Sequence, residues 1–210
     1  MNYNKGEKII VNNNSYVIIS LLGHGKGGYS YLAKCNERLV VLKKIHHEPC
    51  SYYNFSNKIL SEKNDYFRLL DSNINIPKMI DIDIENEIII KEYIEGKTIF
   101  ELVRDDISVI NYLPIVLDMA EKAKSKGMNI DFFPTNFIAK DNELYYIDYE
   151  CNDYHEEWNF NNWGIKYWSK TKEFNDYYKS LKEEEKWMNL KKWLKEDYIM
   201  QWVKIWSSPI

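Results

Sequence analysis

Two neighbouring segments carry the most informative pattern in this sequence: Asn129-Ile130-Asp131-Phe132-Phe133-Pro134-Thr135-Asn136 and, after it, Tyr145-Tyr146-Ile147-Asp148-Tyr149-Glu150. Asp131 stands five positions before Asn136, and Asp148, flanked by apolar residues, stands twelve positions after that asparagine. Amide and carboxylate oxygens are the ligands that Mg²⁺ prefers, and a carboxylate on a loop can orient a hydroxyl. The order and spacing therefore indicate loops in which Asn136 and Asp148 hold a metal while Asp131 faces a hydroxyl.

A glycine-rich segment lies earlier in the chain, and it fits GxGxxG between two apolar stretches: Gly23-His24-Gly25-Lys26-Gly27-Gly28. A dinucleotide fingerprint needs a helix directly after the glycines, and a Walker loop needs GK[ST]. The chain continues instead as Tyr29-Ser30-Tyr31-Leu32. The alternatives left open are an ordinary hairpin and a hairpin whose backbone N–H groups approach phosphates, because the glycines lack side chains. In the second case the phosphate-binding positions are Gly23, Gly25, Gly27 and Gly28.

A lysine follows in the next apolar run, Val40-Val41-Leu42-Lys43, and Glu62 comes nineteen positions after it. Taken alone, a lysine on a strand is most simply a solvated edge residue. Glu62 falls in a predicted helix, from which its carboxylate could orient Lys43 toward a nucleotide phosphate. We therefore interpret the two residues as a candidate ion pair.

Local patterns divide the chain into a β-rich part, residues 1–95, and a mostly helical part, residues 96–210. β-Branched and alternating apolar residues predict strands over 16–22, 29–33, 39–45, 80–84 and 88–91. A helix is expected over 57–70. Beyond Gly96, residues at helical spacing predict a helix from Leu113 that ends near Gly127. Two more helices are expected, one from Lys172 onward and one containing Trp187, Leu190 and Leu194.

Composition excludes several classes of protein. The formal net charge of −4 over 210 residues argues against a dedicated nucleic-acid binder. No apolar run approaches the length of about 20 residues that spans a bilayer, so we expect no membrane partner. Three separated cysteines, outside any CxxC pair, favour a reducing compartment, and we expect a cytoplasmic protein. The histidines, among them His24, His46 and His47, have no carboxylate at ligand spacing, which predicts surface or packing roles.

Taken together, residues 16–150 resemble the protein-kinase-like superfamily. The glycine-rich segment is similar to the phosphate-binding loop in either of two registers, one starting at Gly23 and one at Gly25 with Ser30 in place of the last glycine. Val40–Lys43 is similar to the VAIK strand, and Glu62 to the glutamate that pairs with its lysine. Lys91–Gly96 resembles the hinge, whose backbone at Glu92 and Ile94 would hold adenine. Asn129–Asn136 resembles HRDxxxxN, and Ile147–Glu150 stands where DFG would.

This resemblance implies an α+β, two-lobe kinase-like fold, with an antiparallel β N-lobe carrying one helix and an abbreviated helical C-lobe. It implies ATP and Mg²⁺ as cofactors. Asp131 would act on the acceptor hydroxyl, Lys43 and Glu62 on the phosphates, and Asn136 and Asp148 on the metal.

Differences from the motifs of this superfamily bear on which kind of acceptor the protein would phosphorylate. Asp148-Tyr149-Glu150 lacks the glycine of DFG and is closer to choline and aminoglycoside kinases, and no APE follows. The short form resembles small bacterial serine/threonine kinases. We therefore expect a kinase for a hydroxyl-bearing acceptor, with a protein Ser/Thr hydroxyl favoured. A small-molecule kinase and a nucleotide-binding pseudokinase are the alternatives.

Overall fold

The computed structural model describes residues 3–25, 27–48 and 57–183. The chain divides into two compact units, residues 1–168 and residues 169–210. The helix predicted around Trp187, Leu190 and Leu194 lies outside the described residues, whereas the helix predicted from Lys172 is present over residues 172–183. The division predicted between residues 95 and 96 falls inside the first unit and stays a prediction.

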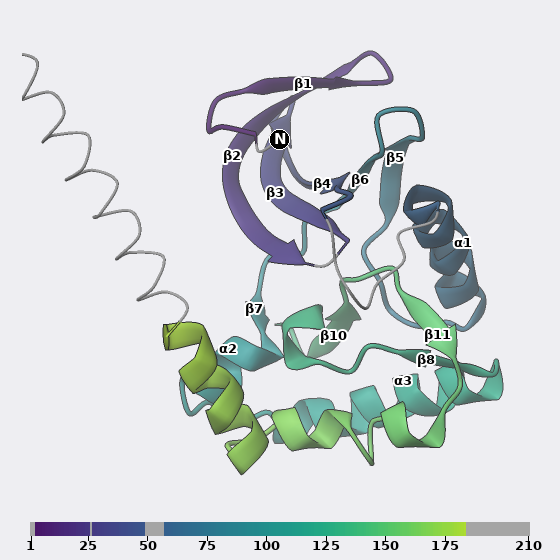
Figure 1. Cartoon of the computed structure of the whole chain (residues 1–210), viewed down its shortest axis with the longest axis vertical. Coiled ribbons are helices and arrows are strands. Elements are labelled where there is room, and N and C mark those ends of the chain that lie inside the picture. Colours follow the sequence, from purple (N-terminus) through teal and green to yellow (C-terminus); the bar gives the residue numbers. More distant parts are fainter. Residues whose placement is uncertain (1–2, 26, 49–56, 184–210) are drawn as a thin grey trace, which may run out of the picture. The chain divides into compact units, whose positions relative to one another are not determined.

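A six-stranded antiparallel sheet forms the first part of the chain (Figure 1), in the order β1-β2-β3-β4-β6-β5. Its strands are β1 (Lys8–Val11), β2 (Asn14–Gly25), β3 (Gly28–Cys35), β4 (Arg38–Ile45), β5 (Met79–Asp83) and β6 (Ile88–Glu92). The five predicted strands are therefore confirmed, with shifted ends. Register shifts between β2 and β3, at Ile18/Ser20 and Leu21/Gly23, mark bulges that increase the bend of a strand. The sheet curls accordingly, and alternate side chains such as Tyr31, Ala33 and Leu42 form its core.

Helix α1 (Lys58–Asp71) crosses over from β4 to β5, one residue beyond the predicted helix at its end. The Asn57 side chain accepts a hydrogen bond from the Leu60 N–H and caps the first turn. Ile59, Tyr66 and Leu69 are buried on one helical face, and the carboxylate of Glu62 lies on that face among them. The apolar contacts of α1 thus carry Glu62 into the interior.

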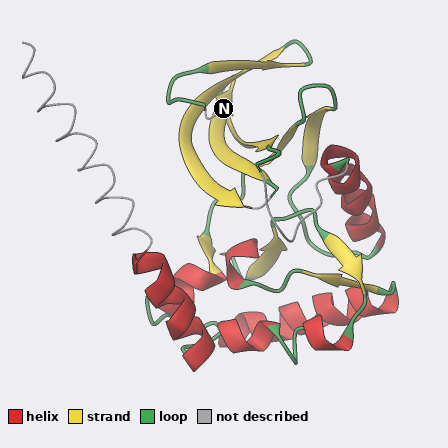
Figure 2. Cartoon of the chain, in the orientation of Figure 1, coloured by secondary structure: helices red, strands yellow, loops and turns green. Residues whose placement is uncertain are grey.

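The remainder of the first unit is less helical than predicted (Figure 2). Two α-helices, α2 (Ile99–Arg104) and α3 (Leu113–Ser125), follow the first of five short strands, and the other four strands come after α3. The strands are β7 (Lys97–Thr98), β8 (Met128–Ile130), β9 (Phe137–Lys140), β10 (Glu143–Tyr146) and β11 (Cys151–Asp153). They form one sheet in the order β10-β9-β7 and one β11-β8 pair. Segments of two to four residues are too short to show a period, which is why the sequence pattern missed them.

An aromatic core lies under the segment that joins β8 to β9. Phe132, Phe137, Phe160 and Trp168 are nearly fully buried and pack with ring centroids 5.2–6.3 Å apart. The Trp168 indole N–H donates to the Phe132 carbonyl over 2.9 Å. Because the ring and the backbone are both held, this core fixes the loop that carries Asp131.

The molecule is therefore a mixed α+β protein built around a curled antiparallel sheet. Among the helices in the described part of the chain, none has the length and apolar character that crossing a bilayer requires.

Candidate active site

Two predicted carboxylates from distant parts of the chain meet at one buried lysine, which was also predicted. The Lys43 Nζ, on β4, lies 2.7 Å from Glu62 Oε1 on α1 and 3.0 Å from Asp148 Oδ1, which follows β10. Lys43 is 8% exposed and Glu62 1%, so little solvent screens the pair. The predicted ion pair between Lys43 and Glu62 is present, and Asp148 joins it.

These contacts set the protonation states. Burial lowers the pKa of Lys43, but Asp148 and Glu62 outweigh it and hold the pKa above its ordinary value. Burial raises the pKa of Asp148, and the ammonium groups of Lys43 and Lys91 reverse this and hold it below the usual range. Both groups are consequently charged at neutral pH.

Asp131 and Asn136 lie on one loop, between β8 and β9. The Phe133 N–H donates to Asp131 Oδ1 over 3.0 Å, and the Asn136 side-chain amide donates to the Asp131 carbonyl over 3.4 Å. The Ile147 N–H donates to the Asn136 carbonyl over 2.9 Å, which ties this loop to the residue before Asp148. The structure therefore brings the predicted metal ligands and Asp131 to adjoining segments.

Burial raises the pKa of the Asp131 carboxyl, and the like charges of Asp148 and Glu150 raise it further. The Phe133 N–H and the Asn136 amide act in the opposite direction. A carboxylate made more basic in this way is suited to accept a proton from a hydroxyl.

The donor set fits a hard divalent cation such as Mg²⁺. The Asn136 amide nitrogen is used within its loop, so its amide oxygen is the atom that would bind the cation. Asp148 Oδ1 accepts from Lys43 Nζ and from the Tyr149 N–H, which leaves Oδ2 as the ligand.

The glycine-rich segment is the turn of a hairpin in which Gly25 pairs with Gly28. A methyl group added at Gly28 would lie 2.8 Å from the Lys44 carbonyl and 3.3 Å from Lys43 Cε, and one at Gly27 would lie 2.8 Å from Lys58 Cε. These two glycines therefore let the hairpin approach the lysines. At Gly23 and Gly25 an added methyl group meets no described atom within 4 Å.

The predicted hinge residues follow the end of β6. The Glu92 N–H donates to the Lys78 carbonyl over 2.9 Å, and the Glu92 carboxylate accepts from the Lys78 N–H over 3.2 Å. A base bound at Glu92 would thus have to use its carbonyl. Ile94 is buried, two residues on.

Sequence reasoning missed three charged residues that contact this group. Lys58 Nζ lies 3.0 Å from Glu150 Oε2 and 3.7 Å from Glu62 Oε1. Lys91 Nζ donates to the Ile147 carbonyl and lies 4.8 Å from the centroid of the Tyr149 ring. Burial, with Lys43 nearby, lowers the pKa of Lys91 to about 8. Glu150 and Lys91 stood in segments that the sequence singled out, but no pattern indicated that they contact this group, and the i, i+4 spacing of Lys58 and Glu62 was the one local signal.

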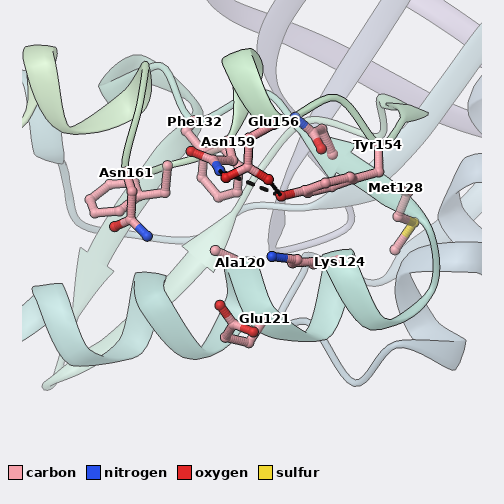
Figure 3. Close-up of a pocket in the computed structure, with 11 residues that line it drawn as sticks. Ala120, Glu121, Lys124, Met128, Phe132, Tyr154, Glu156, Asn159 and Asn161 are labelled. Carbon is pink, nitrogen blue, oxygen red and sulfur yellow. Dashed lines mark hydrogen bonds between the residues drawn. The ribbon is translucent and has the colours of Figure 1, made fainter.

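A separate cavity lies between α3 and residues 154–161 (Figure 3), and its lining includes none of the predicted site residues. Its volume of about 60 Å³ suits a few water molecules. The Tyr154 hydroxyl and the Asn159 amide both donate to the Glu156 carboxylate at its edge. We therefore assign it no ligand.

His24, His46 and His47 lie partly or fully exposed at the surface, as predicted. Although no carboxylate stands at ligand spacing in the sequence, the structure brings His24, His46 and Glu48 together, with ligand atoms within 4.8 Å of one another. The hairpin between β2 and β3 causes this, because it folds His24 back toward the end of β4.

The chain matches no protein-family model and no curated protein sequence.

Proposed function

We propose that this protein is an ATP-dependent phosphotransferase of the protein-kinase-like type, which moves the γ-phosphoryl group of ATP to a hydroxyl acceptor. The observation that carries the proposal is the buried Lys43–Glu62–Asp148 group beside the Asp131–Asn136 loop. Phosphoryl transfer needs mainly positioning and neutralisation of charge, and these residue types supply both.

Each residue has a role that follows from its surroundings. Glu62 holds the Lys43 ammonium group, which then faces the nucleotide phosphates. Asn136 and Asp148 would hold Mg²⁺, whose chemistry is to neutralise charge that develops on the phosphate oxygens. Asp131, made more basic by burial, orients the acceptor hydroxyl and takes its proton.

As the acceptor we favour a protein Ser/Thr hydroxyl, from the resemblance to the small bacterial kinases. A small-molecule hydroxyl is the second candidate, and one observation favours it. Glu150, at the place of the DFG glycine, binds Lys58, and the chain pairs directly afterwards as β11 with β8. This early pairing leaves little chain near Asp148 for a peptide platform.

The test is transfer of labelled γ-phosphate by the purified full chain with Mg²⁺, offered a panel of proteins and a panel of small alcohols. We expect label on one panel, and a loss of roughly 10²–10⁴-fold in Asp131→Asn. Asp118→Asn, on the exposed face of α3 and paired with Lys122, is the matched control. Tight ATP binding without transfer to either panel would instead support a nucleotide-binding module.

A further inference from the structure

His24, His46 and Glu48 form a cluster outside the candidate active site, where the hairpin meets the end of β4. His24 Nε2 lies 3.2 Å from His46 Nε2 and 3.6 Å from Glu48 Oε2. Two ligands of a tetrahedral ion, each about 2.0–2.1 Å from it, lie roughly 3.4 Å apart. These two separations lie on either side of that value, and all three ligand atoms lie within 4.8 Å of one another. One ion can therefore contact all three once the side chains move closer together.

A second layer of contacts holds the ligand groups in place. The Tyr29 hydroxyl donates to Glu48 Oε1 over 2.5 Å, which turns the other carboxylate oxygen toward the histidines. The Tyr29 ring stacks on the His24 ring, with centroids 4.2 Å apart and planes 8° from parallel. Hydrogen bonds that orient a ligand typically raise its affinity for the metal. The same hydroxyl is the main reason that the pKa of Glu48 is lowered, so the carboxylate is ionised.

We propose that His24, His46 and Glu48 form a binding site for a divalent transition-metal ion, with Zn²⁺ as the natural occupant. Two imidazole nitrogens and one carboxylate are ligands that zinc accepts, whereas Mg²⁺ and Ca²⁺ favour oxygen alone. Three protein ligands leave a fourth position for water. The neighbouring cavity of about 490 Å³, which His46 and Glu48 help to line, offers room for it.

Binding the ion changes which ring nitrogen of His46 carries the proton. Without metal, His46 Nδ1 accepts from the Glu48 N–H over 3.1 Å, so the neutral ring carries its proton on Nε2. That Nε2–H faces the Gly25 carbonyl over 3.0 Å. To bind metal through Nε2, the ring must carry its proton on Nδ1 instead. The Glu48 N–H then loses its acceptor, and because Glu48 is exposed, water can replace it.

The ion would connect the turn of the glycine-rich hairpin to the segment that follows β4. His24 stands between Gly23 and Gly25 near the turn, and His46 and Glu48 follow the last residue of β4. Bound metal would therefore anchor the hairpin turn to the end of β4. This site does not depend on the proposed kinase activity.

The experiment is a calorimetric titration of the full chain with Zn²⁺ alone, supported by the visible absorption spectrum of the Co²⁺ form. We expect one ion per chain and a four-coordinate cobalt spectrum. His24→Gln and His46→Gln should each weaken zinc binding by at least roughly 100-fold, and Tyr29→Phe by roughly 10-fold. His47→Gln should bind as the wild type does, because His47 pairs with Glu87 instead.

The proposal is overturned if His24→Gln and His47→Gln bind zinc equally, or if no saturable binding occurs in the wild type. It is also overturned if binding persists in His24→Gln and disappears in Asp148→Asn. That result would place the ion at the proposed magnesium site. The three ligands are partly or fully exposed, so these variants are expected to fold, and circular dichroism checks this.

Discussion

Lys43 and Glu62 are joined by a 2.7 Å ion pair between β4 and α1, and both side chains are almost completely buried. The pair connects the sheet to its crossing helix, and Asp148 extends it to the segment after β10. Removing one member of a buried pair leaves the other charge without a counter-ion. The stability lost in this way exceeds the net stability that the intact pair contributes.

This relationship predicts a non-additive mutant cycle. Lys43→Met should lower the free energy of unfolding by about 3–5 kcal/mol, because Glu62 and Asp148 then lose their buried counter-ion. The double variant Lys43→Met/Glu62→Met should lose less than the sum of the two single variants. Urea denaturation of the four proteins measures the coupling, expected at about 1–3 kcal/mol. Strictly additive losses would show that the two residues do not interact.

Asp131→Asn should separate activity from stability. Burial and like charges raise the pKa of this carboxyl, so the fold disfavours the charged form, and a neutral amide should not lower the melting temperature. Phosphoryl transfer should fall by roughly 10²–10⁴-fold at unchanged ATP affinity. A melting curve, a nucleotide titration and a transfer assay on the same sample give the comparison. Near wild-type transfer would remove Asp131 from its assigned role.

Asp148→Asn should abolish the magnesium-dependent part of stabilisation by ATP. At about 100 times its dissociation constant, a ligand adds roughly 2.7 kcal/mol, equivalent to about 5–10 °C in a chain of this size. ATP with EDTA should shift the wild type much less. The variant should also melt earlier without ligand, since it loses its ion pair with Lys43.

The control for Asp148 is Asp118→Asn, whose exposed carboxylate pairs with Lys122 on α3. It should keep the full Mg-ATP shift. If Asp148→Asn keeps that shift as well and only the ligand-free melting temperature falls, Asp148 is structural and holds no metal.

Lys91 predicts a pH-dependent difference in stability. Its pKa is lowered from 10.5 to about 8, so below pH 8 the Lys91 side chain is charged in both the folded and the unfolded state. In that range the folded protein bears the full free-energy cost of burying this charge. As the pH rises from 8 toward 10.5, the folded protein loses this proton first and gains stability. Relative to Lys91→Met, the wild type should gain about 1–3 kcal/mol between pH 7 and 10.

Urea unfolding across that pH range measures the Lys91 effect, because other titrating groups cancel in the difference between the two proteins. Lys122→Met, at an exposed lysine on α3, should show no comparable change with pH. A difference between wild type and Lys91→Met that stays constant with pH would contradict the shifted pKa.

Two glycines of the hairpin should differ sharply on substitution. Gly28→Ala places a methyl group 2.8 Å from the Lys44 carbonyl, a backbone atom that cannot move away freely, and should cost about 1–3 kcal/mol. Gly23→Ala meets no described atom within 4 Å and should change stability by less than about 0.5 kcal/mol. Thermal denaturation of both variants provides the test, and equal effects would mean that the close approach at Gly28 is absent.

Local sequence patterns predicted much of the secondary structure of this protein and most of its candidate site residues. Alternation and β-branched runs predicted five of the six strands of the large sheet, and β1 was missed. The helix expected over residues 57–70 is α1, within one residue at each end. These features depend on neighbours in sequence, which is why local patterns reveal them. The same reasoning selected Lys43, Glu62, Asp131, Asn136 and Asp148, since each belongs to a spaced motif.

Tertiary structure alone decided the contacts between distant segments. Lys91 stands at the end of a predicted strand, where the hinge-like segment begins, and its burial beside Lys43 arises only because β6 pairs with β4. Likewise, His24 and Glu48 are 24 positions apart in the sequence and meet only because β2 and β3 form a hairpin beside β4. Electrostatic shifts and ligand geometry depend on distance in space, and a strand register changes that distance without leaving a local pattern.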